Sequence, residues 1–390
     1  MDNEQRTKED REKQLLSKLF TPLSEVVDEP KTYVFSPYVP SGKLTGLIAL
    51  PGVGKTKFAD GLAAYVSAGK PMFGNVPCEK SGSVLIFSTE DDCVDHKKTV
   101  AACGGNMEKV FILSQSDAAL DWTASNPVKF SSPIIETAIK SIRPAMVIFD
   151  PIQQYFGRID SNSQTETSSA LAPLVKLARK YDCAIVLVGH AGKGNNDSLQ
   201  AKAIGSTNIV GQMRSMLSIV RDPECPSENI VIHVKSNNVH GDSIRYKILP
   251  IPDDEDFAKV EFIRTEKYSE SDYRKSIKQM ERIKAEEEIT EDDPIVKTIL
   301  HLANQNKGLV RIGRKDMEKA VETVGSDYLS EGLESICKRY GSWLQRNHGI
   351  SIKTGTSQPI KPFRILNEIM LPEKSPDRVI SIKQSTYSPP

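Results

Sequence analysis

The chain has 390 residues, of which 51 are Lys or Arg and 51 are Asp or Glu, so its formal net charge at pH 7 is zero. This balance excludes any argument for nucleic-acid binding from overall charge, and such an argument has to rest on local clustering. The length is sufficient for one large α/β domain of roughly 200–250 residues and a smaller second domain.

The cysteines and the N-terminus exclude further classes of protein. No two cysteines form a C-x-x-C pair, which excludes this zinc-ligand spacing and is typical of reduced cysteines in a cytosolic protein. The first residues are charged where a secretory signal would be apolar, and no apolar run approaches the roughly 20 residues that span a bilayer. We therefore expect a soluble, cytoplasmic protein with no membrane partner.

The first two segments of the chain differ in pattern. Residues 1–32 are dense in charge with leucines at helical spacing, which predicts an N-terminal helix or arm. In residues 33–265, strand-like runs alternate with helical ones, as is typical of a mostly parallel sheet covered by helices, the α/β class. The predicted strands are Gly46–Leu50, Val84–Ser88, Val110–Leu113, Met146–Asp150, Ala184–Gly189, Ser215–Arg221 and Asn229–Lys235. Two later strands, around Arg245–Pro250 and Lys259–Ile263, have no helix between them and predict an antiparallel extension at the sheet edge.

A smaller unit is predicted after residue 265. Residues 266–293 are almost wholly charged and predict a solvated helix and linker. Residues 294–367 have helix-like stretches followed by two short strand-like pieces, the order of a small α+β winged-helix domain. The predicted pieces are Ile295–Asn304, Arg314–Val324, Tyr328–Asn347, Ile350–Lys353 and Pro362–Ile365. Residues 368–390 are rich in Pro and Ser and predict a disordered tail.

Basic residues gather in this second unit. No acidic residue occurs between Ser335 and Asn367, where six Lys and Arg residues are interleaved with Tyr340 and Trp343. This imbalance is typical of a surface that binds the phosphate backbone of a nucleic acid. A protein-docking wing with solvated lysines has the same pattern, and the sequence leaves both interpretations open.

A phosphate-binding loop is the strongest functional signal. Residues 49–56 read Ala-Leu-Pro-Gly-Val-Gly-Lys-Thr and match the pattern G-x-x-x-x-G-K-[ST] except for Ala49. Gly52 and Gly54 allow turn dihedrals that direct backbone N–H groups at phosphate oxygens. Lys55 reaches the terminal phosphates and the Thr56 hydroxyl ligates Mg²⁺. We expect the nucleotide-binding residues to be Pro51, Gly52, Val53, Gly54, Lys55 and Thr56.

Two carboxylates and a histidine follow predicted strands downstream of this loop. Asp150 ends an apolar strand in the Walker B arrangement, which holds Mg²⁺. Glu90 follows residues 84–88, where a glutamate can orient and deprotonate the attacking water. Asp91 is the alternative base, and capping of the next helix is the structural alternative for these acids. His190 ends residues 184–190, where an imidazole senses the γ-phosphate or has a structural role only.

The loop that follows His190 is rich in Gly and Asn. Residues 191–202 predict a mobile loop that contacts a nucleic-acid strand, with Lys193 and Lys202 available for phosphate.

Taken together, five segments resemble the plasmid RepA-type hexameric helicases, a RecA-like family related to the DnaB replicative helicases. The segments are Ala49–Thr56, Phe87–Asp92, Val147–Pro151, Val188–Gly194 and Ile204–Arg214. The resemblance covers about residues 30–250 and runs in the family's order. It implies a RecA-like core that assembles as a ring, with nucleotide between neighbouring subunits, Glu90 as the base and His190 as the sensor.

The resemblance also implies two residues that act on a neighbouring subunit. Arg214 is in the position of an arginine finger, a residue type that contributes roughly 10³–10⁵ in rate. Lys235 would help at the same interface, because Val234–Asn238 resembles the family's Lys-x-Asn strand end. The sequence departs from the family at Ile204, where an arginine is frequent, and in its basic C-terminal unit, which resembles the winged-helix tails of ATPases carried by phages and integrating elements.

These features predict an ATP-hydrolysing, ring-forming motor that acts on single-stranded DNA with ATP and Mg²⁺. Such a protein would be a replicative helicase or helicase-like DNA-dependent ATPase of a phage, plasmid or integrating element. A replication or element-encoded protein would bind through the C-terminal domain. The alternatives are a RecA-type recombination mediator or regulatory ATPase, and a nucleotide-switched protein-interaction module without unwinding. Intact Glu90 and Arg214 argue against the switch, because a switch can dispense with both.

Overall fold

The chain divides into two compact units, Met1–Asp272 and Tyr273–Pro390. The boundary falls within helix α8, Glu270–Glu287, which lies in the predicted charged linker. The predicted division of the chain into five segments stays a prediction. The computed structural model describes residues 13–17, 19–28, 30–72, 75–157, 163–191, 198–199, 207–252, 254–305, 309–310, 333–348, 351–354 and 366–370.

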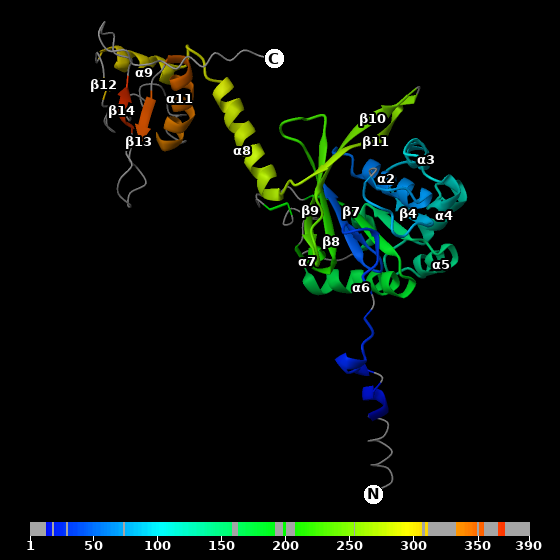
Figure 1. The fold of residues 1–390 in the computed structure, drawn as a ribbon. Coiled ribbons are helices and arrows are strands. Elements are labelled where there is room, and N and C mark those ends of the chain that lie inside the picture. The colour runs from blue at the N-terminus through cyan, green and yellow to red at the C-terminus, as the bar shows by residue number, and fades with distance from the viewer. Residues whose placement is uncertain are drawn as a thin grey trace. The chain divides into compact units, whose positions relative to one another are not determined.

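The first unit is built on a nine-stranded sheet in the order β11-β10-β9-β8-β3-β7-β6-β4-β5 (Figure 1). The six strands from β8 to β5 are mutually parallel, whereas β9, β10 and β11 pair antiparallel at one edge. The predicted RecA-like α/β class and the antiparallel extension are both confirmed. In sheet order the strands are Asp254–Glu266, Ser243–Ile251, Asn229–Ser236, Ser215–Arg221, Leu44–Ala49, Ala184–His190, Met146–Asp150, Val84–Ser88 and Val110–Ile112.

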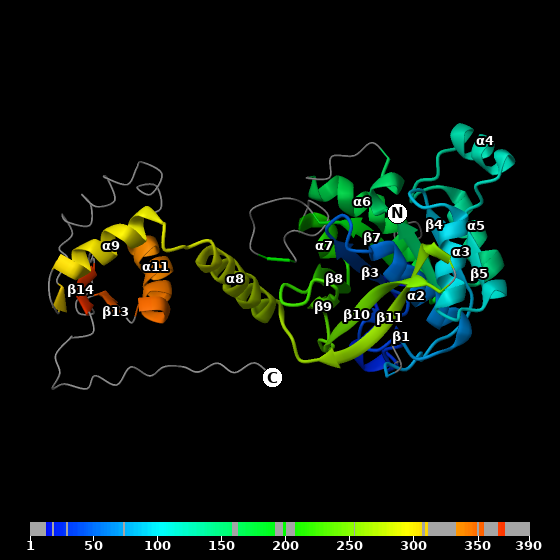
Figure 2. The ribbon, with the colours of Figure 1, turned by 90° about the horizontal axis from the view of Figure 1, so that it is seen from above.

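Helices cover both faces of this sheet (Figure 2). Apolar residues of α2 and α3 pack in one cluster with the strands, and those of α5, α6 and α7 pack in a second cluster on the opposite face. The helices are α2 Lys55–Ala68, α3 Cys93–Ala102, α4 Asp117–Ser125, α5 Pro133–Ile142, α6 Gln164–Tyr181 and α7 Thr207–Gln212. Within the described residues, short 3₁₀ turns occur at Leu23–Glu25, Met107–Lys109 and Ile152–Tyr155.

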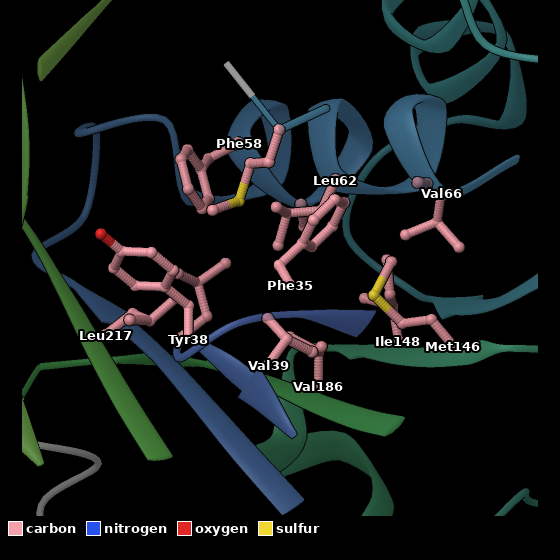
Figure 3. Close-up of a cluster of buried hydrophobic side chains, with 14 of the residues drawn as sticks. Phe35, Tyr38, Val39, Phe58, Leu62, Val66, Met146, Ile148, Val186 and Leu217 are labelled. Atoms are coloured by element: carbon pink, nitrogen blue, oxygen red, sulfur yellow. The ribbon is translucent and has the colours of Figure 1, made fainter. Parts of the chain in front are cut away.

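The central strands are apolar throughout because both of their faces are buried. In β6, Met146 and Ile148 point into the α2 cluster, while Val147 and Phe149 belong to the cluster on the other face. Figure 3 shows the first of these clusters, in which Phe58 from α2 faces the strands. A buried parallel sheet of this kind places the carboxyl ends of its strands at one edge, where loops can form a site.

A small two-stranded sheet precedes the core. It pairs β1, Tyr33–Phe35, with β2, Val39–Pro40, and its Phe35 is fully buried against α2 (Figure 3). Upstream, residues 13–17 are helical, but the leucines of the predicted apolar stripe, Leu15, Leu16 and Leu19, are exposed. The arm therefore leaves this stripe uncovered within the described part of the chain.

The β10–β11 hairpin leaves the sheet and crosses the helices that follow the phosphate-binding loop. Only Ile244, Arg245 and Tyr246 of β10 pair with β9. Beyond them the hairpin packs on α2 and α3, where Thr99 Oγ1 donates to the Ala258 carbonyl at 3.0 Å and Val260 lies against Gly61. The hairpin thus covers the outer side of the helix that begins with Lys55.

The second unit contains helices and a three-stranded antiparallel sheet. The helices are α9 Pro294–Gln305 and α11 Leu333–His348, and the sheet has the order β12 Leu309–Val310, β14 Leu366–Met370 and β13 Ser351–Thr354. The predicted helix Arg314–Val324 and strand Pro362–Ile365 lie outside the described residues. Strand β14 pairs with β12 and β13 through residues 368–370, whereas the predicted disordered tail from residue 368 stays a prediction.

Two aromatic residues of the basic segment have structural partners. Tyr340 is only 1% exposed, and its hydroxyl donates to Asp293 Oδ2 at 2.8 Å. Trp343 lies beside the His348 ring, with the ring centroids 5.4 Å apart. Tyr340 is therefore not available to stack on a nucleic-acid base.

Candidate nucleotide-binding site

The phosphate-binding loop joins β3 to α2 with the backbone that its glycines predict. Gly52 and Gly54 both have positive φ, 76° and 83°, which is the left-handed region that favours glycine. A Cβ on Gly54 would also lie 2.0 Å from Ile248 Cδ1 of the covering hairpin. Ala49, which replaces the first glycine of the motif, is the last residue of β3 and pairs in register with His190. This position has regular strand backbone and so does not require glycine.

The Walker A threonine and the Walker B aspartate meet directly. Thr56 Oγ1 donates to Asp150 Oδ2 at 2.7 Å, and Asp150 is 1% exposed. Burial raises the pKa of the Asp150 carboxyl, while the Thr56 hydrogen bond and the charge of Lys55 oppose that rise. Its second oxygen, Oδ1, is buried and has no hydrogen-bond partner among the described residues. A hydroxyl beside an unsatisfied buried carboxylate oxygen fits the oxygen-ligand preference of Mg²⁺.

The predicted base and sensor also lie together. His190 Nε2 is 3.3 Å from Glu90 Oε1, and both side chains are partly exposed. The contact arises because β6 lies between β4 and β7, so all three strands end at the edge where the phosphate-binding loop begins. The prediction that His190 lies on a strand beside Walker B is confirmed, whereas the catalytic roles of Glu90 and His190 stay predictions.

Arg214 and Lys235 lie at the other end of the sheet. Arg214 precedes β8, and its N–H donates to the Leu44 carbonyl at the amino end of β3 at 3.0 Å. Lys235 of β9 pairs with Met216 of β8, and the Lys235 Nζ donates to the Val210 carbonyl at 2.6 Å. Burial and the nearby charge of Arg214 lower the pKa of Lys235. These two cations are thus neighbours of each other.

Neither cation can reach the phosphate-binding loop of its own chain. The five-residue rise from Leu44 to Ala49 corresponds to about 16 Å of strand, more than an extended arginine side chain spans. Within one chain, the structure therefore brings Lys55, Thr56, Asp150, Glu90 and His190 together and leaves Arg214 and Lys235 apart from them.

Arg221, which the sequence analysis did not identify, lies at the edge of the sheet where the phosphate-binding loop begins. It is the last residue of β8, which runs parallel to β3, and its Nη2 lies 3.5 Å from the Gly52 carbonyl oxygen. The next residue, Asp222, is buried and forms an ion pair with Arg245, which anchors the end of the strand. The local sequence gives no signal for the contact of Arg221 with Gly52, since this contact depends on β8 lying beside β3.

A second missed feature is a buried pair of titratable residues behind the loop. His96 Nδ1 of α3 is 2.7 Å from Asp60 Oδ1 of α2, and the two side chains are 4% and 2% exposed. Burial raises the pKa of Asp60 to about 6, and Asp60 raises the pKa of His96 despite the opposing effect of burial. The sequence signal for this pair was Asp60, a charged residue among the apolar residues of α2.

Comparison with known proteins agrees with this geometry. Residues 9–196 match the family model described as an AAA domain, a stretch that contains Lys55, Glu90, Asp150 and His190. This part of the chain therefore resembles an AAA domain. The match ends before Arg214, so it gives no information on the two cations at the far end of the sheet.

No curated protein matches the sequence. Among solved structures, the "ATPase Domain of G40P" is similar with a TM-score of 0.42 and 14% identity, over 58% of this chain and 86% of that chain. A similarity at this level carries no argument about activity. The interpretation of the site therefore rests on the sheet order and on the contacts within the site. The predicted contacts of Lys193 and Lys202 fall outside the described residues.

Proposed function

We propose that the protein is an ATP-hydrolysing, ring-forming motor that acts on single-stranded DNA, as a replicative helicase or helicase-like DNA-dependent ATPase of a phage, plasmid or integrating element. The observation that carries the proposal is the arrangement of two incomplete half-sites at opposite ends of one sheet. One half has the phosphate-binding loop with Glu90, and the other has Arg214 and Lys235. A head-to-tail assembly joins such halves into complete sites.

Each residue of the first half has a task in hydrolysis. Lys55 binds the terminal phosphates, and Glu90 accepts the proton of the attacking water. His190, 3.3 Å from Glu90, holds that carboxylate and responds to the γ-phosphate. Thr56 and Asp150 would hold Mg²⁺, which neutralises charge on the β- and γ-phosphate oxygens.

The residues of the second half complete the site of a neighbour. Arg214 donates to the γ-phosphate as charge develops in the transition state, and Lys235 supports it from β9. Burial lowers the pKa of Lys235, and the nearby charge of Arg214 adds to this effect. A phosphate between the two cations would relieve their repulsion.

The second unit is proposed to bind a replication or element-encoded protein. Burial of Tyr340 and its hydrogen bond to Asp293 remove one aromatic residue from the set that would stack on bases. This observation favours protein docking over base stacking for the basic segment.

The test is the steady-state ATPase rate with and without single-stranded DNA, with assembly state measured by light scattering on the same samples. We expect DNA to stimulate hydrolysis in a particle of ring size, and the matched variant Lys55→Ala to be inactive in both conditions. A monomer or dimer whose rate ignores DNA would contradict the motor and favour a nucleotide-switched interaction module.

A further inference from the structure

A polar cluster with a buried centre joins the helix that begins with the phosphate-binding loop to the helix that follows Glu90. Its centre is the hydrogen bond between Asp60 Oδ1 and His96 Nδ1, 2.7 Å long. Around it, Lys57 Nζ lies 3.9 Å from Asp91 Oδ2 and 3.7 Å from Asp95 Oδ1. These contacts all run between α2, which carries Lys57 and Asp60, and the segment formed by α3 and the turn before it.

The pair is unusual in its surroundings. The neighbours of Asp60 along α2, such as Ala59 and Leu62, belong to the apolar cluster, and so does Val100 of α3. Asp60 Oδ2 and His96 Nε2 are both buried without a hydrogen-bond partner among the described residues. A half-satisfied buried pair stabilises a fold less than two apolar residues of similar volume would. Stability alone therefore gives no reason for this pair to be present.

Its location gives a reason connected with hydrolysis. Asp60 lies one helical turn after Thr56, on the same side of α2, and Thr56 bonds to Asp150. His96 is the fourth residue of α3, only six residues after Glu90. The turn between them is fixed on its other side by Gln115, whose Oε1 accepts from the Cys93 N–H at 2.8 Å and whose Nε2 donates to the Asp91 carbonyl at 3.1 Å. The hydrogen bond between Asp60 and His96 therefore links the phosphate-binding helix to the helix that follows the Glu90 turn.

We propose that Asp60 and His96 are positioning residues for Glu90, which hold that carboxylate at the correct separation from a triphosphate bound on Lys55. This inference rests on the proposed ATPase function. Displacement of a catalytic group by about 1 Å can reduce a rate by roughly 100-fold, while binding of the nucleotide depends on the loop itself. Loss of the pair should consequently lower kcat and leave KM and ATP binding nearly unchanged.

The decisive variant replaces both residues with leucine, Asp60→Leu with His96→Leu, which leaves no unpaired charge. We expect its kcat to fall roughly 10- to 100-fold, with unchanged binding of a fluorescent ATP analogue and a melting temperature equal to or above that of the wild type. Asp60→Asn alone keeps an oxygen acceptor opposite His96 Nδ1 and should retain most of the wild-type kcat. A purely structural pair would give the opposite result, a lower melting temperature with kcat unchanged.

Thr99→Val is the matched control on the same helix. Thr99 is fully buried, one turn after His96, and its hydrogen bond goes to Ala258 of β11 and not to α2. We expect this variant to lose stability and keep its kcat. The positioning role is overturned if the double leucine variant hydrolyses ATP at the wild-type rate. If the wild-type chain binds ATP but hydrolyses none under any condition, the proposed ATPase function fails, and the positioning role fails with it.

Discussion

Arg214→Ala offers a sharp test of the shared site, because the geometry separates the two halves within each chain. Arg214 adjoins Leu44 at the amino end of β3, whereas the phosphate-binding loop follows Ala49 at its carboxyl end. An arginine finger contributes roughly 10³–10⁵ in rate, so Arg214→Ala alone should retain less than about a thousandth of the activity. Lys55→Ala should be inactive as well, since it removes the contact to the terminal phosphates.

Mixing the two inactive variants should restore activity by a calculable amount. A site is active only where a chain with an intact Lys55 meets a neighbour with an intact Arg214. In a random equal mixture, about one interface in four satisfies this condition in any head-to-tail assembly. We therefore expect about a quarter of the wild-type rate per subunit, at least 100-fold above either variant alone.

The assay is phosphate release after subunits are mixed, with the particle size followed by light scattering. A control mixture of Arg214→Ala with the double variant Lys55→Ala/Arg214→Ala contains no finger and should stay inactive. Restored activity in that control would point to assembly effects. Absence of any gain in the complementary mixture, with particles intact and subunits shown to exchange, would refute the assignment of Arg214 to a neighbour's site.

Three further predictions concern the site and its surroundings. Glu90→Gln should bind ATP as tightly as the wild type by equilibrium fluorescence while kcat falls roughly 10²–10⁴-fold, and an unchanged kcat would exclude Glu90 as the base. Gly54→Ala should lower the free energy of unfolding in urea by about 1–2 kcal/mol, because φ at this residue is 83°, and Ile248→Val should recover only the part due to contact with the new methyl group. Folding raises the pKa of Asp60 from 3.8 to about 6 and also raises the pKa of His96. The contribution of the two protonated groups to stability is therefore complete below their pKa values in the unfolded chain, and it is lost as pH rises through their pKa values in the folded chain. The charges of Lys57, Asp91 and Asp150 also act on the pair. Thermal unfolding measured across this pH range should therefore show a fall in stability with rising pH, and the double leucine variant should lack that fall.

Residues next to one another in the sequence account for most of what could be predicted about the site. The phosphate-binding loop, Asp150 and Glu90 each follow an apolar strand, and parallel strands all end at one edge of a sheet. That rule places these residues at one edge of the sheet, and in the structure Thr56 contacts Asp150 and Glu90 contacts His190. The same rule places Arg221, the last residue of the predicted strand Ser215–Arg221, at that edge as well. Its contact with Gly52 could not be predicted, because the rule does not say which strand lies beside β3.

The basic C-terminal segment illustrates the opposite outcome. Composition alone groups Tyr340 with Trp343 and the surrounding lysines and arginines. In the folded unit, the Tyr340 hydroxyl is bonded to Asp293, which lies 47 positions earlier in the chain. Burial depends on such distant contacts, and a count of residue types in a window cannot detect them.

The sequence by itself determined the α/β class, the phosphate-binding loop and the carboxylates at the strand ends, because strand periodicity and glycine dihedrals are properties of short segments. Only the tertiary structure decided three other features: Arg214 and Lys235 are remote from the loop of their own chain, Arg221 adjoins it, and Asp60 meets His96. Each of these depends on strand order, register or helix packing between segments far apart in the chain. Such pairings arise from burial of the whole apolar core and are not encoded in any one segment.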